Sequence, residues 1–173
     1  MRISKIYFML ILFSVVWFSV AQAETLEDSV NGYKIEHPLD WSATTFPNST
    51  DLVKANIFKD STTGVQVRID SSRDMDFDSF VKWYSDDFMK QMQGRWGGSI
   101  EIIEQKNISL AGENCSVTTF DLKRDDGQRR FFKVYLIPHD GKIYLMQCGS
   151  PFDARSSIEP IIDSIAGSFS FTR

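Results

Sequence analysis

The sequence predicts an α+β protein, specifically an α/β/α sandwich with a central antiparallel meander sheet covered by helices. Three observations lead to this class. Most of the chain alternates apolar and polar residues with the period of a strand. One segment, 77–92, has the period of a helix instead. Between residues 114 and 148 both alternating sets are apolar, and a sheet that is apolar on both faces needs cover on both faces.

The first 23 residues have the three parts of a secretory signal peptide. Arg2 and Lys5 form a basic start, an apolar run spans 6–20, and small residues end at Ala23. We predict cleavage after Ala23 and a periplasmic or secreted location. Glu24 rather than Cys follows, so a lipoprotein is not expected. An uncleaved signal anchor is the alternative, because the uncharged stretch is of marginal length for a membrane span.

The remaining 150 residues carry 17 basic and 23 acidic side chains, a net charge of −6. This length supports one hydrophobic core, so we expect a disordered lead over 24–29 and a single domain over 30–173. Nucleic acid is not expected as a partner, because phosphate binding requires clustered Lys and Arg. No later apolar stretch has the length of a transmembrane helix, and we expect a monomer.

Four short strands are predicted to form an antiparallel meander at the start of the domain. The first alternates apolar and polar side chains until Pro38, which cannot donate a ladder hydrogen bond. The last two are joined by 59–64, a segment rich in turn residues. The four strands are 33–37, 41–46, 52–58 and 65–69.

The helix predicted over 77–92 has one apolar face and a polar opposite face. Asp76 or Asp78 is expected as its N-cap, and Gly94 is expected to end it. The inward residues share helical spacing: Phe77, Phe80, Val81, Tyr84, Phe88 and Met92.

Four longer strands follow, joined by three short turns rich in Gly and Asp. Sequential strands with short links usually pair, which again favours a meander. A second helix is expected over 154–166, with Pro160 in its first turn, and a short strand over 168–172 follows it. The four longer strands are 100–110, 114–123, 129–137 and 142–148.

Four segments of the chain follow a known family pattern: Tyr33-x-Ile35-x-x-Pro38-x-x-Trp41, a turn at Gly112 before the long meander, Lys142-Ile143-Tyr144, and Ile165-x-x-Ser168-Phe169-x-Phe171. They resemble the PsbP-like family, which includes the extrinsic PsbP protein of photosystem II and exported bacterial proteins of DcrB-like type. The resemblance runs through nearly all of the chain after the signal peptide. It implies an antiparallel sheet between helices, and binding or assembly roles without established catalysis.

Two cysteines in an exported protein favour one disulfide. The predicted meander argues against it, because it places Cys115 and Cys148 two strands apart, roughly 9 to 10 Å. Bridged residues have Cα atoms within about 7 Å of each other. We therefore predict two buried free thiols.

The spacing Asp74-x-Asp76-x-Asp78 is similar to the first half of a calcium loop. The second half is missing, because Ser79 stands where glycine is needed and Ser85 where a bidentate Glu is needed. Helix capping is the preferred interpretation of these acids. They stay weak metal candidates, and no metal site or cofactor is predicted.

No catalytic motif is recognisable. His37 precedes a proline at a strand end and His139 lies in a predicted turn, without a nucleophile elbow or an HExxH pair. Zinc is not indicated, because the two His and two Cys include no closely spaced pair of ligands. We predict that the protein is not an enzyme. A hydrolase with dispersed residues is a weaker alternative.

Two basic surfaces are candidates for protein contact. One is the hairpin tip between Lys123 and Arg130, which also holds Arg129, and the other is the pair Arg95-Trp96 between glycines. Trp and Arg are enriched in interface hot spots, so Arg95, Trp96, Arg129 and Arg130 are the predicted contact residues. The structural alternative is a solvated turn, with Trp96 folded back over the sheet edge.

These observations predict an exported, non-enzymatic binding or accessory protein that contacts an unknown protein partner at the periplasmic side of a membrane. The alternative is a small-molecule or metal-ion binding protein. Its site would be a cleft between helix 77–92 and the sheet, with Asp74, Asp76 and Asp78 near the mouth.

Overall fold

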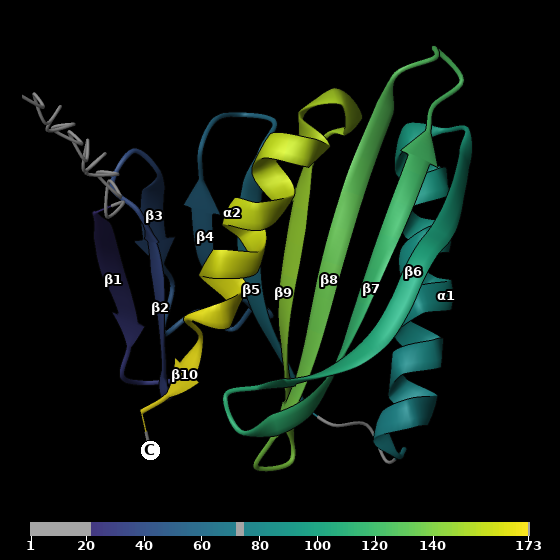
Figure 1. The fold of residues 1–173 in the computed structure, drawn as a ribbon. Coiled ribbons are helices and arrows are strands. Elements are labelled where there is room, and N and C mark those ends of the chain that lie inside the picture. Colours follow the sequence, from purple (N-terminus) through teal and green to yellow (C-terminus); the bar gives the residue numbers. More distant parts are fainter. Residues whose placement is uncertain (1–21, 72–74, 173) are drawn as a thin grey trace, which may run out of the picture.

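A seven-stranded antiparallel sheet forms the centre of the computed structural model, which describes residues 22–71 and 75–172 (Figure 1). Its strand order is β3-β4-β5-β9-β8-β7-β6, so the predicted meander β6 to β9 is confirmed and is extended through pairing of β5 with β9. The strands are β3 (Ser42–Thr45), β4 (Val53–Phe58), β5 (Gly64–Ser71), β6 (Ser99–Leu110), β7 (Glu113–Lys123), β8 (Arg129–His139) and β9 (Lys142–Pro151).

A second sheet has three strands, and it corrects the predicted meander at the start of the domain. β2 (Tyr33–Pro38) does not pair with β3; it lies between β1 (Ala23–Asp28) and β10 (Ser170–Phe171). The strand at 33–37 was therefore predicted correctly, but its partners were not. The expected strand over 168–172 is reduced to β10.

The disordered lead expected over 24–29 is wrong, because most of it belongs to β1. Leu26 pairs with Ile35 and is buried in the core, and Asp28 is also buried. The Asp28 carboxylate accepts hydrogen bonds from the backbone N–H groups of Val30 (3.1 Å) and Asn31 (3.0 Å), which stabilises the turn into β2. Pairing with β2 thus orders a segment whose acidic composition alone favours disorder.

Helix α1 (Phe77–Trp96) begins as predicted and ends later. The Asp76 carboxylate accepts a hydrogen bond from the backbone N–H of Ser79 at 2.9 Å, so Asp76 is the N-cap. The helix passes through Gly94 and ends at Gly97, whose φ of 69° is the left-handed conformation that glycine tolerates. The predicted end at Gly94 is wrong for that reason.

Helix α2 (Arg155–Gly167) follows the short 3₁₀ segment η1 (Phe152–Ala154). Pro160 lies inside the helix and not in its first turn as expected. A proline there cannot donate to the carbonyl of Ser156, and its ring is on the exposed side of the helix.

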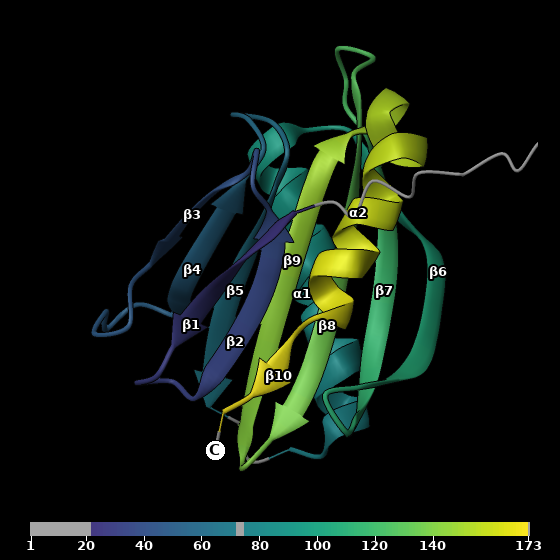
Figure 2. The ribbon, with the colours of Figure 1, turned by 60° about the vertical axis from the view of Figure 1, so that its left-hand side comes forward.

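The two faces of the seven-stranded sheet are covered by different elements. α1 packs on one face, whereas α2 and the three-stranded sheet pack on the other (Figures 1 and 2). Side chains that alternate along β8 contribute to the hydrophobic core on each face of the sheet. Phe132 and Val134 face α1, and Phe131 and Tyr135 face α2. The α+β sandwich is confirmed, with a small sheet added to one of its covering layers.

Cys115 lies on β7 and Cys148 on β9, with β8 between them. Both are free and buried, which confirms the prediction from the meander.

Within residues 22–71 and 75–172, no helix combines the length and apolar composition that a membrane span requires. The predicted signal peptide lies outside these residues, except for Gln22 and Ala23.

Candidate functional site

Three arginines surround one tryptophan at the C-terminal end of α1. The guanidinium carbons of Arg130, Arg124 and Arg95 lie 4.8, 5.4 and 5.8 Å from the centroid of the Trp96 ring. Each distance is within the range of a cation–π interaction. We call Arg95, Trp96, Arg124 and Arg130 the arginine–tryptophan cluster. It joins the end of α1, the turn after β7 and the start of β8.

The hydrogen bonds of the cluster leave several donors unused. Arg130 donates to the carbonyl oxygen of Thr62 at 2.6 Å, and Arg124 pairs with Asp126 at 3.1 Å. Among the described residues, the Nε atoms of Arg124 and Arg130 and the indole Nε1 have no hydrogen-bond partner. Burial and the nearby charge of Arg124 lower the pKa of Arg130. The cluster therefore concentrates positive charge within an acidic protein.

Arg129 does not belong to this cluster, although it precedes Arg130 in the sequence. Its guanidinium group forms an ion pair with Asp121 and lies 3.6 Å from the ring centroid of Phe152, on the α2 side of the sheet. Successive side chains of a strand point to opposite faces, so the predicted contact surface is divided. Arg124, from the same hairpin, takes the place of Arg129.

Trp96 lies in the last turn of α1 and not in the loop predicted between glycines. Its half-buried ring packs against the core under α1, as does Ile100 of β6. The alternative that Trp96 folds back onto the sheet therefore describes part of its role, and the three guanidinium groups contact the same ring.

Two adjoining cavities, of about 280 and 250 Å³, extend from the cluster along α1. They share Gln66, Met92, Arg95 and Gln147. Arg130 and Asp60 line the first cavity, and Arg68, Asp70 and Asp87 line the second. This groove is polar and carries both signs of charge.

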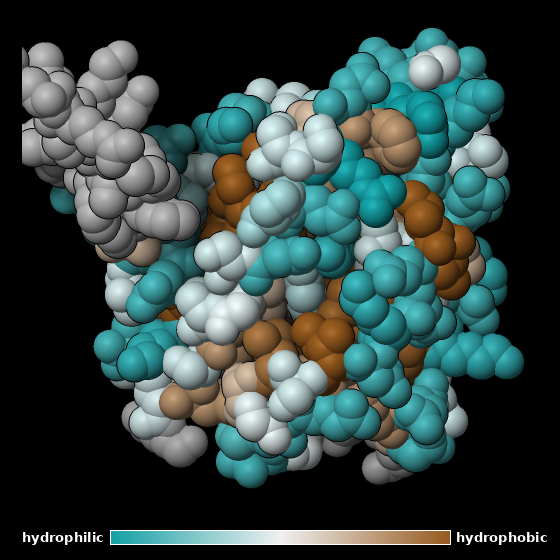
Figure 3. Space-filling model, in the orientation of Figure 1, coloured by the Kyte–Doolittle hydropathy of each residue, from teal (hydrophilic) through white to brown (hydrophobic). Residues whose placement is uncertain are grey.

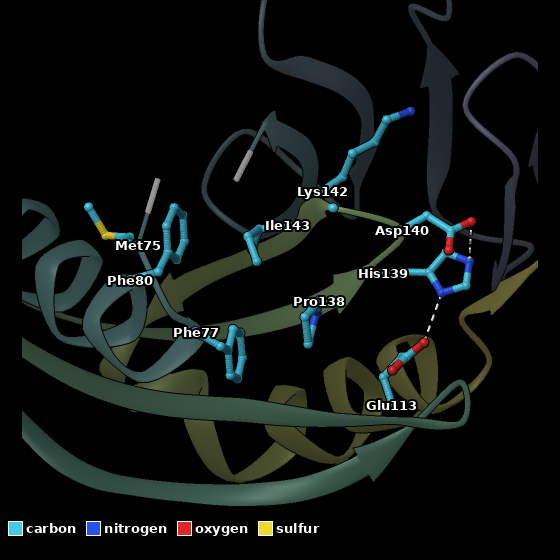
Figure 4. Close-up of a pocket in the computed structure, with 10 residues that line it drawn as sticks. Met75, Phe77, Phe80, Glu113, Pro138, His139, Asp140, Lys142 and Ile143 are labelled. Atoms are coloured by element: carbon cyan, nitrogen blue, oxygen red, sulfur yellow. Dashed lines mark hydrogen bonds and ion pairs between the residues drawn. The ribbon is translucent and has the colours of Figure 1, made fainter. Parts of the chain in front are cut away.

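A separate pocket of about 330 Å³ lies at the N-terminal end of α1. Figure 4 shows Met75, Phe77 and Phe80 on the helix side and His139 between Glu113 and Asp140 at the other end. His139 Nδ1 is 2.8 Å from Glu113 Oε1, and Nε2 is 3.6 Å from Asp140 Oδ2.

The chemistry of this pocket is limited by its lining. A carboxylate can orient the imidazole of His139 through its contact with Nδ1. The residues that line the pocket include no Ser, Thr or Cys that could act as a nucleophile beside it. His139 was expected in a turn, but it ends β8 opposite the start of β7, where Glu113 lies. The predicted meander contains the information needed to pair the two.

The aspartates of the calcium-like spacing have separate roles. Asp74 lies outside the described residues. Asp76 caps α1, and hydrogen bonds from Ser79 lower the pKa of Asp76, while Asp78 lies in the first helical turn. Across 22–71 and 75–172, no three His, Cys, Asp or Glu side chains come together in a way that could hold a metal ion.

Comparison with solved structures identifies the same fold in several proteins. Cyanobacterial PsbP from Synechocystis sp. PCC 6803 is 17% identical, with a TM-score of 0.70, covering 92% of this chain and 98% of that one. The yeast Ran-binding protein Mog1p from Saccharomyces cerevisiae is 11% identical, with a TM-score of 0.61 and coverage of 88% and 96%. LpqN of Mycobacterium tuberculosis, involved in cell envelope biogenesis, is 14% identical, with a TM-score of 0.58 and coverage of 88% and 91%.

Sequence comparison gives the family directly. No curated protein matches the chain significantly. The profile of the PsbP family, however, matches residues 21–171, which is nearly the whole chain after the predicted signal peptide. The resemblance noted in the sequence is therefore confirmed, and this chain belongs to the PsbP family.

Proposed function

We propose that the protein is an exported, non-enzymatic binding or accessory protein that acts through protein contacts at the periplasmic side of a membrane. The arginine–tryptophan cluster is the observation that carries this proposal. Trp and Arg dominate interface hot spots, because each offers a large contact area with a directional polar group. The fold supports it as well, because a protein of the same fold, Mog1p, is a Ran-binding protein.

Two further observations support the proposal. The first 23 residues have the pattern of a signal peptide, which directs a chain out of the cytoplasm. The pocket in Figure 4 holds the pair of His139 and Glu113 without a nucleophile beside it, an arrangement that favours binding over group transfer.

Capture of partners from membrane extracts tests the proposal. The immobilised protein is compared with Arg95→Gln and Arg130→Gln, which each remove one charge from the cluster. Lys123→Gln is the matched control, because Lys123 is exposed at the same hairpin and is absent from the cation–π contacts. We expect each cluster variant to weaken capture of a specific protein by about tenfold and the control to leave capture unchanged.

The proposal fails if no protein is captured specifically, or if the cluster variants capture the same protein as well as the control does. Melting temperatures of all variants identify any loss that is due to unfolding. Equal weakening by Lys123→Gln would also contradict it, because general charge attraction would then explain the capture.

A second candidate function is small-molecule binding in the cleft between α1 and the sheet. The pocket of Figure 4 favours it, because Met75 and Phe77 line this pocket and alternate in sequence with Asp76 and Asp78. This pocket lies beside the end of α1 where the sequence suggests the mouth of a cleft, near Asp76 and Asp78. A thermal-shift ligand screen tests the idea. Hits must disappear in Met75→Trp, which fills the cavity, and a hit that persists in that variant binds elsewhere.

A further inference from the structure

A larger pocket, of about 430 Å³, lies between α2 and the end of β2. Its walls are mainly apolar, with Trp41, which directly precedes β3, on one side and Ile161 and Ile165 from α2 on the other. Figure 3 shows apolar surface beside α2 on this face of the molecule. We call this cavity the α2 pocket. Its volume is within the range of small-molecule sites.

His37 supplies a buried polar group to the α2 pocket. Its side chain is 3% exposed, on the inward face of β2. His37 Nδ1 lies 3.0 Å from the carbonyl oxygen of Pro38, and a ring nitrogen in contact with a carbonyl must carry the hydrogen. In the tautomer with the hydrogen on Nδ1, Nε2 is the ring nitrogen that can accept a hydrogen bond.

The charged groups of the pocket are mostly acceptors as well. Glu36 and Asp40 contribute two carboxylates to the lining, and Lys59 contributes one ammonium group. Within the described part of the chain, none of these three side chains forms an ion pair. An apolar cavity with surplus acceptors favours a ligand that is apolar at one end and donates hydrogen bonds at the other.

We propose that the α2 pocket binds a small amphipathic amine. The apolar part of the ligand packs between Trp41 and Ile161. Its ammonium group faces the carboxylates of Glu36 and Asp40 and the Nε2 acceptor of His37. This site is separate from the arginine–tryptophan cluster, so it neither depends on the proposed protein contacts nor competes with them.

Three ligands with the same six-carbon chain test the chemistry: hexylamine, hexanol and hexanoate. Titration calorimetry and thermal shift use the purified chain from Glu24 onward near neutral pH, because the predicted cleavage removes Gln22 and Ala23 and leaves the other lining residues of the pocket in place. We expect hexylamine to bind about fivefold or more tightly than hexanoate, with hexanol between them. Asp40→Asn should reduce this preference without unfolding the protein, since Asp40 is exposed.

A pair of tryptophan substitutions locates the binding. Ile161→Trp fills the α2 pocket from its helix wall and should abolish binding of hexylamine. Ile102→Trp adds the same side chain at an exposed position on β6 and should leave binding unchanged. The proposal is overturned if hexanoate binds as tightly as hexylamine, if none of the three ligands binds, or if folded Ile161→Trp still binds the amine.

Discussion

Neighbouring residues of this chain have contacts on opposite sides of the molecule. Arg130 packs on Trp96 under α1, and Arg129 packs on Phe152 near α2, although one peptide bond separates them. Cation–π contacts of this kind contribute about 0.5 to 2 kcal/mol each, depending on burial. The position of a basic residue within the strand, more than its presence in a basic run, decides whether it joins the cluster.

The two thiols should be unreactive in the folded protein. Burial raises the pKa of Cys115 to about 11 and also raises the pKa of Cys148, and the thiolate is the reactive form of cysteine. We expect almost no reaction with a disulfide reagent near neutral pH, and reaction of both thiols after denaturation. Absorbance of the released chromophore measures this. Labelling of the native protein at the rate of a free thiol would contradict the burial of these residues.

At the scale of single elements, the junction between α1 and β6 depends on two consecutive glycines with positive φ. Gly97 ends the helix, and Gly98, at φ 81°, turns the chain into β6. A Cβ atom at Gly98 would lie 2.1 Å from the carbonyl oxygen of Lys123, whereas one at Gly94 would meet nothing within 4 Å. A side chain therefore has space at position 94, whereas position 98 requires glycine.

Alanine substitutions at these two positions should change stability in opposite directions. Gly94→Ala lies within a helix and should stabilise the protein by about 1 kcal/mol, because alanine loses less backbone entropy. Gly98→Ala should destabilise it by more than about 2 kcal/mol, through positive φ and the clash with Lys123. Urea unfolding of both variants checks this. Equal effects would mean that α1 ends near Gly94, as the sequence first indicates.

Local patterns predict the elements of this fold better than their partners. The period of 33–37 correctly predicts a strand, since alternation is a local property. That β2 pairs with β1 and β10 instead of β3 depends on residues 170–171, far along the chain. The candidate sites differ in the same way. Arg95 and Trp96 are adjacent in sequence, whereas the approach of Arg130 to Trp96 follows from how α1 crosses the sheet.

For the molecule as a whole, one buried lysine ties α2 to the sheet. Lys133 of β8 is almost fully buried, and its Nζ lies 3.0 Å from Glu159 Oε1 and 2.6 Å from Asp163 Oδ1. Tyr135 also donates a hydrogen bond to Asp163. Removing one partner of a buried ion pair costs more than the pair contributes, because the other charges lose their compensation.

This network should make stability depend on pH at both extremes. Burial opposes ionisation of Glu159, but hydrogen bonds from Arg155 and Lys133 prevail and lower its pKa below 4.5. Its contribution is present above pH 4.5 and is lost as the pH falls through the lowered pKa. Burial also opposes the charge of Lys133, yet bonds to Asp163 and Glu159 raise its pKa above 10.5. That contribution is present below pH 10.5 and is lost as the pH rises.

Lys133→Met separates these effects from the rest of the protein. The variant should be less stable near neutral pH by about 2 kcal/mol, because Glu159 and Asp163 are only partly exposed to compensating water. As the pH rises into the alkaline range, its melting temperature should not show the fall that the wild-type protein shows. Arg155→Gln, which leaves Lys133 in place, is the control. If Lys133→Met keeps the wild-type fall in melting temperature at alkaline pH, groups other than Lys133 cause that fall.

The pairing of β2 with both β1 and β10 also sets the order in which the molecule can be completed. Tyr33 pairs with Phe171 and stacks on Phe169, and both of these partners follow it far along the chain. Figure 2 shows β2 beside β10. During synthesis from the N-terminus, one edge of β2 and the Tyr33 ring have no native partner until residues 169–171 have been made. The three-stranded sheet can therefore be completed only after all strands of the seven-stranded sheet have been synthesised.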